Sequence, residues 1–381
     1  MKLRTPIFIL LISLLSVTCS VQKTSHGRQR DIWTSQQANT WYAKQGWLVG
    51  ANFITSSAIN QLEMWQAETF DTATINRELG WAQAIGMNTM RVFLHDLLHQ
   101  QDAAGFYKRM DVFLQIAQRH GIKPLFVLFD SCWDPFPKSG KQREPKPHVH
   151  NSGWVQSPGQ YALKDSTQYP RLEKYVKGVV SKFATDPRIL GWDVWNEPDN
   201  MTGASYEKVE IPNKVAYVLP LLKKTFEWSR SVNPAQPLTS GIWAGDWSSP
   251  SELKPIEKLQ LEESDIISFH NYDTPQEFEK RIRLLQRYNK PILCTEYMAR
   301  PNGSMFQGFL PIAQKYHVAM YNWGFVNGKS QTIYPWDSWT KTYTSEPPLW
   351  FHDIFQKDGT PYKPEEVEAI RKLTKEGIHA N

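Results

Sequence analysis

Short apolar runs with the residue preferences of β-strands alternate along the chain with stretches of helical periodicity. The runs occupy residues 48–53, 88–94, 124–129, 189–195, 237–242, 265–269, 291–295 and 318–323. Amphipathic segments separate most of them; in one, Phe106, Met110, Phe113 and Ala117 recur with the spacing of a buried helical stripe. Strands that alternate with helices are typical of a parallel sheet, and eight of them predict a single (β/α)8 barrel. A doubly wound open sheet is the alternative, which is disfavoured because no glycine-rich phosphate turn follows the first run.

The alternation breaks at residues 131–166, which are rich in Pro, Gly, Lys and His. A connection of about 35 residues is far longer than usual and indicates either a functional loop or a disordered excursion. Trp133, Trp154 and Tyr161 lie in this segment, and we expect them to belong to an ordered wall of a binding cleft. The sequence therefore predicts a long loop insertion after the third strand.

The N-terminal residues have the pattern of an export signal. Lys2 and Arg4 precede an apolar run at residues 6–17 that is too short to span a bilayer. We expect a signal peptide at 1–19, a polar tether at 20–40 and the folded domain at 41–381. Cys19 leaves two routes open, lipidation and plain secretion. The predicted location is extracellular, periplasmic or lipid-anchored at a bacterial cell surface, with membrane contact only through that lipid.

Charge and cysteine content limit the partners. The formal net charge of +5 is spread along the 381 residues, so it does not indicate a nucleic-acid-binding surface. Of the three cysteines, Cys132 and Cys294 remain after processing, and we expect them on strands across the barrel from one another, too far apart for a disulfide. We expect a monomer.

Two strand-like runs end in a glutamate. The run 189–195 leads into Asn196-Glu197-Pro198, and the run 291–295 leads into Glu296. In a parallel barrel the carboxyl ends of all strands meet at one mouth, so both carboxylates are expected there. Two carboxyl groups, one ionised and one protonated, are what glycosidic bond cleavage requires. This chemistry needs no cofactor, and none is expected.

The segments Trp195-Asn196-Glu197-Pro198 and Thr295-Glu296 resemble the retaining glycoside hydrolases of clan A, most closely the cellulase- and mannanase-like family 5. The resemblance covers the whole domain. It implies that Glu197 is the acid/base and Glu296 the nucleophile of a retaining β-glycosidase acting on an oligo- or polysaccharide. It further implies substrate-binding or supporting roles for Arg91, Asn196, His270, Tyr272 and Trp323.

The sequence departs from this family at the end of the third strand, where family 5 proteins usually carry a histidine. We expect His95, on the same strand face as Arg91, to take its place. Trp133 and Trp154 are further candidates for sugar stacking. Lys329, in the loop after the eighth strand, is a candidate for holding an acidic sugar.

Two alternatives use other residues or other chemistry. A glycan-binding protein without turnover would use the same barrel and aromatic side chains. A metal-dependent hydrolase would use His148 and His150 with Asp130 or Asp134, although no catalytic-zinc spacing such as His-Glu-x-x-His occurs. The glutamate pair favours the glycosidase, for which no metal is expected.

Overall fold

Eight parallel strands form the centre of the computed structural model, which describes residues 30–378. The strands are β1 (Val49–Phe53), β2 (Thr89–Phe93), β3 (Lys123–Val127), β4 (Gly191–Asp193), β5 (Leu238–Thr239), β6 (Ile267–His270), β7 (Ile292–Tyr297) and β8 (Ala319–Asn322). Their order is β5-β4-β3-β2-β1-β8-β7-β6, and a parallel bridge from Ile242 to Phe269 joins the two ends. The predicted barrel is confirmed, and this closure excludes the open doubly wound sheet.

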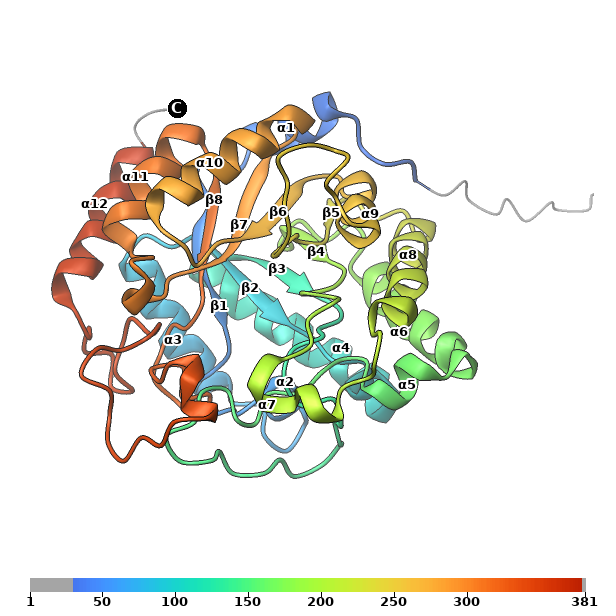
Figure 1. Cartoon of the computed structure of the whole chain (residues 1–381), viewed down its shortest axis with the longest axis horizontal. Helices are drawn as coiled ribbons and strands as arrows, with labels where there is room; N and C mark the ends of the chain where they lie inside the picture. The colour runs from blue at the N-terminus through green and yellow to red at the C-terminus, as the bar shows by residue number, and fades with distance from the viewer. Residues whose placement is uncertain (1–29, 379–381) are drawn as a thin grey trace, which may run out of the picture.

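Helices surround the strands (Figure 1). They are α1 (Ser35–Ala43), α2 (Gln61–Trp65), α3 (Thr72–Ala84), α4 (Asp96–Arg119), α5 (Gln160–Lys164), α6 (Tyr169–Lys182), α7 (Gly203–Tyr206), α8 (Val215–Ser231), α9 (Pro255–Glu263), α10 (Pro275–Leu285), α11 (Phe306–Tyr316) and α12 (Pro364–Ile378). The chain signals its helix starts locally: Pro364 opens α12 with Glu365 and Glu366 in the first turn, where acidic side chains favour the positive end of the helix dipole. None of these helices has the length and apolar character needed to cross a membrane, a finding that applies to residues 30–378.

The N-terminal end of the barrel is covered by α1. Residues 30–40 belong to the fold, although we expected them in the tether: Thr34 and Gln37 form a capping box, and Arg30 pairs with the buried Asp265 at 2.6 Å. Tyr42 on α1 packs with the lowest layer of the barrel interior, and its hydroxyl donates to the His317 carbonyl. The expected signal peptide, Cys19 and residues 20–29 lie outside the described residues.

We expected both cysteines on strands. Cys294 is on β7, but Cys132 lies in the loop after β3. Both are buried free thiols.

The long insertion after β3 is ordered against its surroundings. Apart from α5 and a short 3-10 turn it is irregular, yet backbone bridges join Asp130 to Ser157 and Asp134 to Val155. It lies beside the segment 327–353 that follows β8, and the two form the lower rim of the molecule in Figure 1. These two loops stand over the carboxyl ends of the strands, where the predicted site residues are found.

Candidate active site

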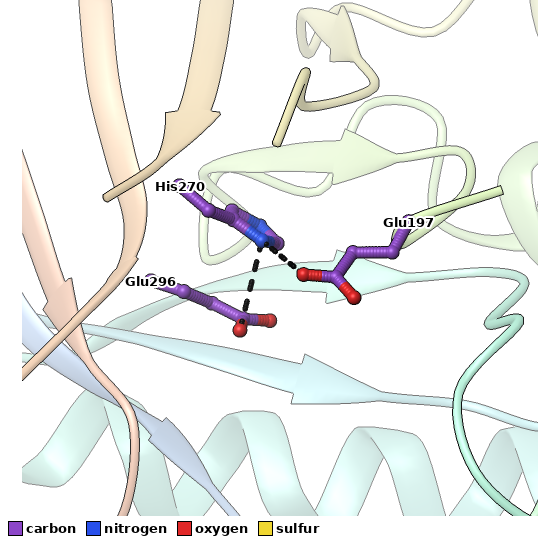
Figure 2. Close-up of side chains that lie close together, drawn as sticks. All are labelled: Glu197, His270 and Glu296. Atoms are coloured by element: carbon purple, nitrogen blue, oxygen red, sulfur yellow. Dashed lines mark hydrogen bonds and ion pairs between the residues drawn. The ribbon is translucent and has the colours of Figure 1, made fainter. Parts of the chain in front are cut away.

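Glu197 and Glu296 face each other at the carboxyl end of the barrel, with His270 between them (Figure 2). The His270 Nδ1 lies 2.7 Å from Glu197 Oε1 and 3.6 Å from Glu296 Oε2. One carboxylate oxygen of Glu197 lies within 4.8 Å of one of Glu296. Retaining glycosidases hold their two carboxyl groups about 5–5.5 Å apart, whereas inverting enzymes need about 6.5–9.5 Å to admit a water. The spacing therefore fits direct attack by one carboxylate on the sugar.

Both oxygens of Glu296 accept hydrogen bonds that hold the carboxylate in place. The buried Arg91 donates through Nη1 to Oε1 at 2.9 Å, and the Tyr272 hydroxyl donates to Oε2 at 2.8 Å. Arg91 is itself held by Asp193 and Asn52. Burial raises the pKa of Glu296, while the positive charge of Arg91 opposes that rise. The carboxylate is thus fixed and kept available for attack.

Glu197 has the surroundings of a general acid. Burial raises the pKa of its carboxyl, so the proton is retained to higher pH than in an exposed glutamate. Asn200 and the Cys132 thiol donate to Oε2, the thiol at 3.2 Å. The Glu197 backbone has a φ of 40°, in the left-handed region that glutamate rarely adopts and that the following proline further disfavours. Such strain is retained where the surroundings fix a functional side chain.

His270 is a neutral link between the glutamates. Burial lowers its pKa to about 4, so the ring is uncharged near neutral pH. When Glu197 is ionised, its Oε1 can only accept a hydrogen bond. In that state the ring proton of His270 is therefore on Nδ1. The ring orients Glu197 through this hydrogen bond and lies beside Glu296 without adding a positive charge.

Asn196 is held from both sides. Its Oδ1 accepts from Arg91 Nη2 at 2.7 Å, and its Nδ2 donates to Asp130 Oδ1 at 2.9 Å. Trp154 in turn donates to Asp130 Oδ2. These bonds fix the orientation of the amide where it lines the cleft.

The cleft above the glutamates has a volume of about 550 Å³. Six of the predicted site residues line it: Trp133, Asn196, Glu197, Tyr272, Glu296 and Trp323. Arg91 and His270 stand behind the glutamates as described above, and both are buried. Trp154 does not line the cleft; it packs its ring against Trp323 at 5.6 Å. The structure therefore brings together most of the residues that the sequence singles out.

Two predicted substrate-binding residues lie elsewhere. His95 caps α4 by accepting from the Leu97 backbone N–H, so it does not stand in for the missing histidine of the third strand. Lys329 pairs with Glu63 at 2.6 Å, away from the cleft. Neither lines the cleft, because local capping and ion pairing, which strand periodicity does not reveal, decide where these side chains lie.

The histidines of the metal alternative are engaged in separate contacts. His148 stacks on Tyr334 and hydrogen-bonds to the Tyr343 carbonyl. His150 hydrogen-bonds to the Tyr334 carbonyl, and burial lowers its pKa to about 4. Within residues 30–378, the three side chains that approach closely enough to share an ion are Glu197, His270 and Glu296. The structure thus gives no support to a metal site at His148 and His150.

Several cleft residues were not predicted from the sequence. They are Cys132, Asn151, Asn200, Trp243, Trp336 and Trp339. Cys132 could have been found from its place directly after a strand end. The others come from loops whose paths periodicity does not predict.

Comparisons with known proteins agree with this geometry. The family model for cellulase (glycosyl hydrolase family 5) matches residues 50–342. A probable mannan endo-1,4-β-mannosidase A-1 from Aspergillus terreus is 35% identical over 91 residues, which are 24% of this chain and 21% of that relative. The match thus spans about a fifth of the relative's length.

Solved structures share the barrel. An exo-β-1,4-mannosidase from Opitutaceae bacterium strain TAV5 has a TM-score of 0.59 at 18% identity, covering 87% of this chain and 60% of that chain. An endo-1,4-β-mannanase from Rhizomucor miehei has a TM-score of 0.55 at 14% identity, covering 87% and 98%. At these identities the likeness shows the fold. Because the family model covers most of the chain, including both glutamates, the chain belongs to glycosyl hydrolase family 5, a family of retaining β-glycosidases.

Proposed function

We propose that the protein hydrolyses a β-linked oligo- or polysaccharide by double displacement. Glu296 attacks the anomeric carbon while Glu197 protonates the leaving oxygen, which gives a covalent glycosyl-enzyme. Glu197 then removes a proton from water, which attacks the same carbon and releases the sugar with net retention. The observation that carries this proposal is the approach of the two carboxylates to within 4.8 Å beside the cleft.

A β-1,4-mannoside is the first substrate class to test. The Aspergillus terreus relative is named as a mannan endo-1,4-β-mannosidase, and both structures cited above are named for β-1,4-mannosidase or β-1,4-mannanase activity. A panel of p-nitrophenyl β-mannoside, β-glucoside and β-galactoside, with mannan and cellulose oligosaccharides, discriminates the sugar. A cleft that binds these sugars but releases no product from any of them would favour the glycan-binding alternative.

The nucleophile is tested by removing it. We expect Glu296→Ala to lower kcat for an activated aryl β-glycoside by at least about 10³-fold, because the covalent intermediate cannot form. Added azide fills the space of the lost carboxylate and should restore turnover as a glycosyl azide of inverted configuration. Glu262→Ala, at an exposed glutamate on α9, is the matched control and should keep full activity. Unchanged activity in Glu296→Ala would overturn the assignment.

We infer from Lys2, Arg4 and the apolar run 6–17 that the protein is exported, with Cys19 as the candidate lipidation site. Expression in a bacterium with labelled palmitate, comparing the natural sequence with Cys19→Ala, separates lipidation from plain secretion. Palmitate label that is present on the natural sequence and absent from Cys19→Ala supports the lipid anchor. A monomer remains our expectation, which sedimentation or light scattering tests directly.

A further inference from the structure

The cleft has one closed side, formed by two loops far apart in the sequence. Among the described residues, those that line the cleft come from the segments after β3, β4, β5, β6 and β8, together with Glu296 on β7; the segments after β1 and β2 contribute none. The insertion 131–166 lies over these two segments: Asn60 and Gln61, after β1, donate to the carbonyls of Gly153 and Val155, and Asp96, after β2, donates its backbone N–H to Ser157 Oγ. The insertion therefore covers the side of the cleft above the ends of β1 and β2.

The insertion is joined to the segment 327–353 by direct contacts. His150 donates its backbone N–H to Ser338 Oγ, and Trp339 donates to the His150 carbonyl at 2.8 Å. The rings of Trp133 and Trp339 stack with centroids 5.7 Å apart. The two loops thus form one wall, which we call the loop wall (residues 131–166 and 327–353).

Close backbone approach fixes the loop wall to the first strand's loop. A Cβ atom added at Gly153 would lie 2.1 Å from the Ile59 side chain, and one at Gly328 would lie 2.5 Å from the Ser56 backbone. At Gly328 the near atoms belong to the backbone, so only glycine permits that contact. The wall is therefore packed against the barrel.

The part of the loop wall around Asn151 stands on the side of the reacting sugar, whereas Trp339 of the same wall packs against Tyr206 on the leaving-group side. Glu197 protonates the leaving oxygen, so the leaving group lies beside Glu197 and the residues that follow it, such as Thr202 and Ser205. The reacting sugar lies over Glu296 and Trp323. Asn151, in the loop wall, belongs to this second side: its carbonyl accepts from the Trp154 backbone N–H, and Trp154 packs against Trp323.

Asn151 has an unused polar side chain in the cleft wall. The residue is 1% exposed, and neither its Nδ2 nor its Oδ1 has a hydrogen-bond partner among the described residues. Its φ of 47° is left-handed, and its backbone N–H is held by the Ser330 carbonyl at 2.9 Å. A buried amide without a partner is unfavourable and calls for an explanation, which a bound ligand supplies.

We propose that the loop wall closes the cleft beyond a single sugar, and that the Asn151 amide binds a hydroxyl of that non-reducing terminal sugar. The enzyme would then remove sugars one at a time from chain ends. This inference rests on the proposed function, since it takes Glu197 and Glu296 as acid/base and nucleophile.

Product analysis tests the closed end. Mannopentaose and cellopentaose, each labelled at the reducing end, are digested and sampled with time. We expect free monosaccharide and a labelled ladder that shortens by one sugar per step, and no reaction when the terminal 4-hydroxyl is methylated. Early labelled di- or trisaccharide, or cleavage of the methylated substrate, would overturn this inference and leave the proposed function intact. No hydrolysis of any substrate by the unmodified protein would overturn both.

The amide is tested by Asn151→Gly, because glycine accepts the left-handed backbone while removing the side chain. We expect kcat/KM for the aryl glycoside to fall about 10-fold, the effect of one lost hydrogen bond to a buried partner. The exposed Asn233, with a φ of 51°, gives the matched control Asn233→Gly, which should change nothing.

Deoxy substrates separate sugar binding from a structural role. Asn151 also lines a cavity of about 20 Å³ behind Trp323, which is large enough for one water. If the amide binds the sugar, the unmodified protein should have a lower kcat/KM for one of the 3-, 4- or 6-deoxy glycosides than for the parent glycoside. For that deoxy substrate, Asn151→Gly should cause no further decrease. An equal loss on every substrate would show that Asn151 only supports the wall, and would overturn its assignment.

Discussion

At the scale of single residues, the two glutamates share one environment and titrate as a pair. Burial raises the pKa of both Glu197 and Glu296, and His270 stays neutral between them. Activity requires Glu296 ionised and Glu197 protonated, so it is lost as the pH falls through the lower macroscopic pKa of the pair and as it rises through the upper one.

We therefore expect a bell-shaped kcat/KM profile with both limbs above the ordinary glutamate pKa of about 4.3. In Glu197→Gln, assayed with an aryl glycoside whose leaving group needs no proton, the alkaline limb should disappear and the acid limb remain. An unchanged alkaline limb in this variant would show that another group donates the proton.

Cys132 adjusts the acid/base. Burial raises the pKa of the thiol well above its usual value, so it remains protonated and donates to Glu197 Oε2. This bond stabilises the ionised carboxylate, so Cys132→Ala should raise the Glu197 pKa and move the alkaline limb upward by up to about 0.5 pH unit. Cys132→Ser keeps a donor and should shift it less. A downward shift in Cys132→Ala would contradict this role.

Residues that end a strand could be predicted from the sequence, whereas most residues placed by loops could not, although Trp133 was. Glu197 and Glu296 terminate apolar runs, and barrel geometry then brings them together. We expected His95 and Lys329 in the cleft, but a helix cap holds the His95 side chain and an ion pair holds that of Lys329 elsewhere. Asn151 was missed because its position depends on contact with Ser330 in a separate loop.

At the scale of elements, all eight strands were predicted because each is a buried run of β-forming residues. The helices that were not predicted are the short α2, α5 and α7 and the longer α1 and α9. In α1 only Ala38 and Tyr42 are buried, which is too sparse a stripe to detect, although Thr34 and Gln37 carry the capping signal. The start of α9 carries a helix signal, Pro255 followed by Glu257 in the first turn. The helix was still missed, because it is short and lies between two short strands.

At the scale of the whole molecule, the barrel has one end for chemistry and another for stability. Tyr42 is 5% exposed and joins α1 to the interior at the end away from the glutamates. Tyr42→Ala should lower the free energy of unfolding by about 3–5 kcal/mol, the usual cost of removing a large buried ring, and leave kcat unchanged. Lys44→Ala, an exposed neighbour, should change stability by less than about 0.5 kcal/mol.

Denaturant unfolding measures both variants. If Tyr42→Ala is as stable as the unmodified protein, the packing of Tyr42 against the barrel does not contribute to stability.

The loop wall makes product length a joint property of two segments. His148 and Tyr343 hydrogen-bond although they are 195 positions apart in the chain. Transplanting or trimming one segment alone removes the surface against which the other is folded. An evolutionary or engineered path from chain-end trimming to internal cutting therefore requires paired changes in both segments, and single-loop chimaeras would lose order before they gained a longer groove.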